Sequence, residues 1–130
     1  DTYARVSGAD SPSLILPLRE LGSLYHLQRR FDEAESIYRR LLLLQEKRHG
    51  LEHVDVAQTL SKLARILDRK KQYAEAEPLF TRALAIVDKR GKPDDEEELL
   101  LDILPGLARA YRNTGRDEEA RRVEQRYEKL

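Results

Sequence analysis

The stretch LSKLARIL at residues 60–67, followed by YAEAEPLF at residues 73–80, repeats the pattern of residues 18–25 and 31–38. The two copies keep a constant offset of 42 residues (31 to 73, 34 to 76), and a third, weaker copy follows at 44 (64 to 108). An internal period of roughly 20 to 50 residues is typical of stacked supersecondary units, because a single unit cannot bury its apolar face alone. The repeat therefore predicts an array of three similar units.

Each unit reads as two amphipathic helices. In the second unit the apolar residues with helical spacing are Val56, Leu60, Leu63 and Leu67, and then Tyr73, Ala76, Phe80 and Leu84. Small residues recur at matching positions: Gly22, Ala64 and Ala108 on the first helices, and Ala34, Ala76 and Ala120 on the second. A small side chain lets two helix backbones approach closely, and a larger neighbour fills the groove. We predict an all-α fold, an α-α superhelix (solenoid) of about three antiparallel helix pairs, with the aromatic residues packed in its core.

The same residues carry a family resemblance. Leu18-x-x-Leu21-Gly22-x-x-Tyr25, followed by Ala34-x-x-x-Tyr38, resembles the tetratricopeptide repeat, and the second unit matches this pattern. The 42-residue period and the phrase AEPLFTRAL at residues 76–84 resemble the kinesin-light-chain-like branch of that family. The resemblance implies that the first helices line a concave groove that holds extended segments of protein partners.

The register of the repeat predicts the domain organisation. We expect one domain over residues 1–130, with repeat 1 at 13–50, repeat 2 at 51–92, and repeat 3 with a closing helix at 93–130. Residues 1–12 are then the tail of a preceding helix in a longer array, or a frayed terminus or linker. The last helix keeps one apolar stripe, which is typical of a terminal repeat: Ala120, Val123, Tyr127 and Leu130. Pro105-Gly106 predicts a kink or interruption in its helix.

Composition narrows the possible functions. Lys plus Arg and Asp plus Glu both number 24, so no global field attracts nucleic acid or an anionic membrane. With no cysteine, disulfides and thiolate zinc sites are excluded, and the redox compartment is left undetermined. No apolar run approaches the roughly 18 residues that a membrane span needs. We expect neither a nucleic-acid nor a membrane partner, and a cytoplasmic location; the oligomeric state stays open.

We find no arrangement of residues that predicts catalysis, so we expect no enzyme and no cofactor. His49 and His53 have the spacing of helical metal ligands, but Gly50 lies between them in a predicted turn, which favours a surface loop and no metal site. The acidic run Asp94–Glu98 could dock a basic partner. A place at a helix N-terminus is the stronger interpretation, because carboxylates favour that end of the helix dipole.

Basic residues outnumber acidic ones at the positions expected to face the groove. The candidate partner-binding residues are Arg19, Ser23, His26, Lys62, Arg65, Arg69, Arg109, Arg112 and Asn113. Arg65 and Arg109 occupy equivalent places, and two guanidinium groups on adjacent helices could clamp a carboxylate-rich segment. We predict a protein–protein interaction scaffold whose groove prefers acidic partner segments. Two alternatives stay open: a basic face that is merely solvated, and a structural, oligomerisation or regulatory spacer module within a larger multidomain protein.

Overall fold

The computed structural model describes residues 12–90 and 96–130, and these ranges contain helices and turns but no strand. A short 3-10 helix, η1 (Pro12–Leu14), leads into the first α-helix. The α-helices are α2 (Ile15–Leu27), α3 (Phe31–His49), α4 (Val54–Arg69), α5 (Tyr73–Arg90), α6 (Glu97–Asn113) and α7 (Asp117–Glu128). The all-α prediction is confirmed. The expectations for residues 1–11 and for Asp94 and Asp95 of the acidic run lie outside the described residues.

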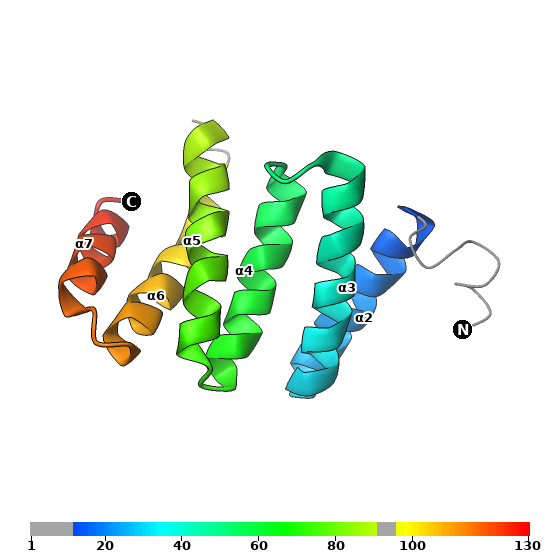
Figure 1. Ribbon diagram of the computed structural model, residues 1–130, viewed down its shortest axis with the longest axis horizontal. Coiled ribbons are helices and arrows are strands. Elements are labelled where there is room, and N and C mark those ends of the chain that lie inside the picture. The colour runs from blue at the N-terminus through cyan, green and yellow to red at the C-terminus, as the bar shows by residue number, and fades with distance from the viewer. Residues whose placement is uncertain (1–11, 91–95) are drawn as a thin grey trace.

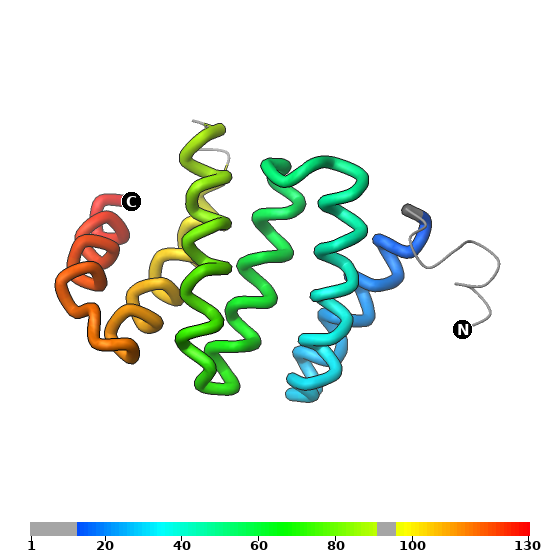
Figure 2. Tube along the Cα trace, viewed as in Figure 1, coloured from blue at the N-terminus to red at the C-terminus, as the bar shows by residue number. Residues whose placement is uncertain are grey.

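The helices form three antiparallel pairs that stand side by side in a curved row (Figure 1). The pairs are α2 with α3, α4 with α5, and α6 with α7. In this view α3 and α5 form the near layer, while α2 and α6 lie behind them, so the fold has two layers (Figure 1). The trace in Figure 2 runs through the row in chain order, with α2 at one end and α7 at the other. Each helix packs on the next, and α4 also contacts α6 directly.

The recurring small residues lie buried between the helices, as expected for positions where two helix backbones approach closely. Ala34, Ala76 and Ala120 are all 0% exposed. The large rings of Tyr38 and Phe80 fill the space beside them, and both are buried. Each ring lies directly against a glycine of a neighbouring helix, where a side chain would not fit. A Cβ atom added to Gly22 would lie 2.9 Å from Tyr38 Cζ, and one added to Gly106 would lie 2.3 Å from Phe80 Cζ. The core is therefore a continuous seam in which aromatic rings press against helix backbones.

One kind of turn closes all three helix pairs. Three residues at equivalent positions have a positive φ: Arg29 (60°), Lys71 (61°) and Gly115 (78°). In each pair, the backbone N–H of the following residue donates to the carbonyl five residues earlier, at 2.8 or 2.9 Å. This bond satisfies a carbonyl that the end of the helix leaves free, as in the Schellman motif. The period of the sequence thus extends to the backbone conformation of its turns.

Ion pairs on the outer helices follow the same period. Arg82 of α5 pairs with Glu46 of α3, and one repeat later Arg126 of α7 donates to Asp88 of α5 at 3.0 Å. Partly exposed pairs of this kind contribute about 0–1 kcal/mol each, because water and salt screen them. They link each repeat to the next, while the buried seam supplies most of the stability.

The aromatic residues do not all lie in the core. The guanidinium of Arg30 lies over Tyr25 at 4.7 Å, and that of Arg116 lies over Tyr111 at 4.5 Å, at equivalent places in the first and third pairs. These two tyrosines are half-buried rather than enclosed. Each ring packs against the hydrophobic core and also has an arginine over its face.

The predicted interruption at Pro105 is wrong, because α6 runs unbroken from Glu97 to Asn113. Proline removes the bond to the carbonyl of Leu101, but Leu101 is 43% exposed, so water can replace that donor. On the opposite side of the helix, buried Ile103 and Leu107 hold α6 in the core. Glu97 and Glu98 lie in the first turn of α6, as predicted for the acidic run.

The apolar stripe of α7 is only partly covered. Ala120 is buried and Val123 half-buried, but Tyr127 and Leu130 are 41% and 45% exposed. The expectation that the aromatic residues pack in the core is therefore wrong for Tyr127. The chain supplies α7 with fewer neighbours than α3 or α5 has, since no later helix covers it in the described residues.

Candidate partner-binding site on the first helices

The nine candidate residues lie on α2, α4 and α6, the first helices of the three pairs. These helices run in the same direction, so equivalent positions line up across their inner face, which we define as the side turned away from α3, α5 and α7. Ser23, Arg65, Arg69, Arg109, Arg112 and Asn113 are exposed, and Arg19, His26 and Lys62 are half-buried. Ser61 of α4, next to Lys62 in the sequence, is only 2% exposed, and its hydroxyl has no hydrogen-bond partner among the described residues.

Five of the candidates form one electrostatic unit, here called the basic cluster: Arg19 and His26 from α2, and Lys62, Arg65 and Arg69 from α4. Burial lowers the pKa of His26, and the positive charges of Arg65, Arg69 and Lys62 lower it further. Burial also lowers the pKa of Lys62, with further contributions from Arg19 and Arg65, while Asp102 opposes the shift. Like charges disfavour each other's charged forms, so this part of the inner face has a positive potential.

Arg65 and Arg109 each have an acidic partner within the fold. Arg65 Nη1 lies 3.7 Å from Asp102 Oδ2, and Arg109 Nη1 lies 2.5 Å from Asp68 Oδ2. The two pairs run in opposite senses between α4 and α6 and cross-link them. Arg65 and Asp102 are both about half exposed, so their contact is loose. A guest carboxylate would therefore compete with these acidic side chains for the guanidinium groups.

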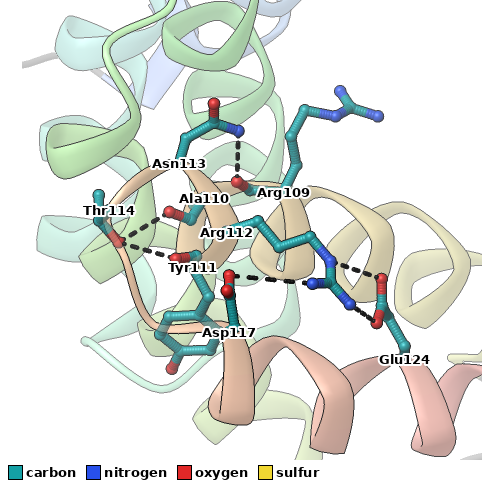
Figure 3. A network of polar contacts seen from close by, with 8 residues as sticks. All are labelled: Arg109, Ala110, Tyr111, Arg112, Asn113, Thr114, Asp117 and Glu124. Carbon is teal, nitrogen blue, oxygen red and sulfur yellow. Dashed lines mark hydrogen bonds and ion pairs between the residues drawn. The ribbon is translucent and has the colours of Figure 1, made fainter.

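Arg112 and Asn113 form hydrogen bonds with residues of α6 and α7, within the third helix pair (Figure 3). Arg112 Nε donates to Glu124 Oε2 of α7 at 3.1 Å, which raises the pKa of Arg112 and lowers that of Glu124. Asn113 Nδ2 donates to the carbonyl of Arg109 at 2.7 Å, and the Arg109 side chain extends away from Arg112 (Figure 3). The structure thus divides the nine residues into the basic cluster with Ser23 and a second group on α6.

An exposed apolar strip on α2 adjoins the basic cluster. Leu16, Leu24 and Leu27 are 58%, 49% and 80% exposed. Leu24 and Leu27 share an open hollow of about 450 Å³ with Ser23, the basic residues Arg19 and Lys62 and one acidic residue, Glu20. Sequence reasoning missed Leu24, although its equivalent in the second repeat, Ile66, is 0% exposed. An unmatched apolar residue at a position that is normally covered is the signal that could have identified it.

The three helix pairs and their period define an all-α repeat protein. A tetratricopeptide repeat family model matches residues 2–89. The chain belongs to the tetratricopeptide repeat family. Repeats of this family generally mediate protein–protein interactions and are typically scaffolds rather than enzymes.

A solved structure supports the kinesin-light-chain-like resemblance. It is the crystal structure of the "Podosopora anserina putative kinesin light chain nearly identical TPR-like repeats", which matches with a TM-score of 0.75 and 26% sequence identity. The match covers 96% of this chain and 58% of that chain, so the present chain spans little more than half of that structure. A comparison with curated proteins found no match. Within the described residues, no helix combines the length and apolar character needed to cross a membrane.

Proposed function

We propose that the inner face binds an acidic segment of a protein partner, with the basic cluster as the main contact. The observation that carries this proposal is the unbalanced positive charge of the cluster. Arg19, Lys62 and Arg69 make no ion pair with any described residue, while Arg65 has only its loose contact with Asp102. Burial lowers the pKa values of His26 and Lys62 most, and repulsion among the positive charges lowers them further; a guest carboxylate would relieve that repulsion.

The apolar strip refines the chemistry of the guest. Leu24 and Leu27 border the same hollow as Arg19 and Lys62, so a segment that carries apolar residues beside its carboxylates complements the surface best. Arg109, Arg112 and Asn113 extend the site along α6 if the guest displaces Asp68 and Glu124 from their arginines. The Arg112–Glu124 pair is exposed at both side chains and is weak enough for that exchange, whereas Asp68 is only 9% exposed and holds Arg109 more firmly.

Charge reversal of residues without ion pairs tests the proposal without breaking the α4–α6 cross-links. The test variant is Arg19→Glu with Arg69→Glu, and the matched control is Arg48→Glu with Lys129→Glu, which changes the net charge equally on the outer helices. The probe is a fluorescent peptide of alternating Glu and Leu, measured by anisotropy at several salt concentrations. We expect the test variant to bind roughly tenfold more weakly and the control to bind like the wild type.

Two results would contradict this function. One is equal affinity of the test variant and the wild type. The other is an equal loss of affinity in the test and control variants, which would reflect net charge rather than a site. Circular dichroism establishes that both variants keep their helix content.

A second function, an assembly module, is favoured by a hollow beside the last described helix, α7. Leu104, Ala108 and Tyr127 line a hollow of about 360 Å³ between α6 and α7. At the equivalent place one repeat earlier, Phe80 is covered by α6. If this surface joins two copies, sedimentation velocity should show concentration-dependent association that Tyr127→Lys abolishes. A monomer at every concentration would exclude self-association through this surface.

A further inference from the structure

The turn between α3 and α4 brings two of the three histidines together. His49 is the last residue of α3, and His53 is the N-cap residue of α4. Gly50 has a φ of +87°, a conformation that glycine adopts at little cost, and it reverses the chain between them. The imidazole rings stack with their centroids 4.2 Å apart and their planes 19° from parallel. The glycine that argued against a helical metal site therefore produces the contact.

Asp55 completes a group of three potential ligands. Its Oδ2 atom lies 3.5 Å from His49 Nε2 and 3.8 Å from His53 Nδ1, and the three ligand atoms all lie within 4.8 Å of one another. Direct N–H···O hydrogen bonds are shorter, at about 2.7–3.2 Å. Ligands around a tetrahedral zinc ion, with bonds of about 2.0–2.2 Å, lie roughly 3.3–3.5 Å apart. The side chains thus converge at separations close to those of a shared metal ion.

We propose that His49, His53 and Asp55 bind a divalent transition-metal ion of the Zn²⁺ class. Two imidazoles and one carboxylate suit zinc, nickel and copper, whereas magnesium prefers oxygen ligands. The side chains are 24%, 38% and 32% exposed, so an ion can reach them and water can fill the remaining coordination position. The chain has no cysteine that could compete for the ion.

Metal binding at this turn is coupled to the start of α4. The backbone N–H of Asp55 donates to His53 Nδ1 at 3.0 Å, which is the N-cap bond of the helix. That nitrogen has one lone pair, so it serves either the cap or the metal. The ion therefore replaces one cap bond with a link between the end of α3 and the start of α4, the junction of the first two repeats.

Isothermal titration of the full chain with ZnCl₂ tests the site. The variants are His49→Gln and His53→Asn, the latter because asparagine still caps a helix. His26→Gln is the matched control, since His26 lies on α2 outside the group. We expect one site in the wild type and in the control, affinity lower by roughly tenfold or more in each test variant, and no comparable binding of Mg²⁺. Zinc should also shift the Asp55 amide resonance in NMR spectra.

Three results would overturn the proposal. They are the absence of zinc binding to the wild type, an equal loss of affinity in the His26→Gln control, or zinc binding that leaves the Asp55 amide unchanged. Because the titration contains no peptide, its outcome is independent of the function proposed for the inner face.

Discussion

Replacing Gly106 by alanine should destabilise the protein, although alanine is the better helix former. Gly106 lies in the middle of α6 and is buried. A Cβ atom there would lie 2.3 Å from Phe80 Cζ and 2.8 Å from both Cε atoms. The Phe80 ring is itself 0% exposed, so it has no free space to move into. Either α6 or the ring must shift.

The magnitude follows from two opposing terms. Alanine gains about 1 kcal/mol of helix propensity over glycine. Overpacking a filled core typically costs about 1–3 kcal/mol, and contacts shorter than any that real Cβ atoms make favour the upper end. We expect a net loss of about 1–2 kcal/mol. Gly22→Ala should cost less, because its Cβ would lie 2.9 Å from Tyr38 Cζ, a milder overlap.

Urea denaturation of the two glycine variants shows directly whether Gly106→Ala loses more stability than Gly22→Ala. Ser36→Ala, at an exposed position of α3, is the control that shows the propensity gain without a steric cost. In the Gly106→Ala background, Phe80→Leu should cost less than it does in the wild type, because the smaller side chain makes room for the new methyl group. A Gly106→Ala variant as stable as the wild type would refute the packing of α6 on the Phe80 ring.

Four further predictions concern described polar, turn and titratable residues. Ser61→Ala should stabilise the fold by about 1 kcal/mol in urea denaturation, because it removes a buried hydroxyl without a partner. Thr59→Val should destabilise it by about 1–3 kcal/mol, because Gln45 loses its hydrogen bond; the opposite order would contradict both assignments. Lys71→Gly should raise the melting temperature slightly, because glycine adopts the φ of +61° at this position without the strain that lysine bears. A lower melting temperature would mean that the greater conformational entropy glycine gives the unfolded chain outweighs the relieved strain. The fold lowers the pKa of His26 below 6.5, so the unfolded chain binds that proton more tightly. Stability should therefore fall as the pH drops through 6.5 toward the folded pKa, and His26→Gln should reduce that slope in pH-dependent unfolding.

The periodic sequence predicts the helices and their pairing because both depend on local spacing. Residues such as Ala76 and Phe80 recur where two backbones must cross, and the structure buries both. The break expected at Pro105 depends instead on what surrounds the helix. Core packing and the exposed position of Leu101 let α6 continue, and neither is visible in the local sequence.

The site was less predictable, because charge balance depends on contacts between helices. Counting along each helix gives a basic face but does not show that Asp68 reaches Arg109 or that Glu124 reaches Arg112. Those pairs require the relative register of neighbouring helices. The stacking of His49 on His53 was not predicted for a similar reason. It depends on the conformation of the turn at Gly50, which the sequence alone does not give.

Chemical-shift mapping tests the proposed guest site most directly. Titration of the labelled protein with the alternating Glu and Leu peptide should perturb the amides of Arg19, Ser23, Lys62 and Arg69 and leave those of α3 and α5 unchanged. It should also raise the pKa of His26, because a bound carboxylate favours the imidazolium. Perturbations confined to the outer helices, or no perturbation at a saturating peptide concentration, would contradict the assignment of the inner face as the partner-binding surface.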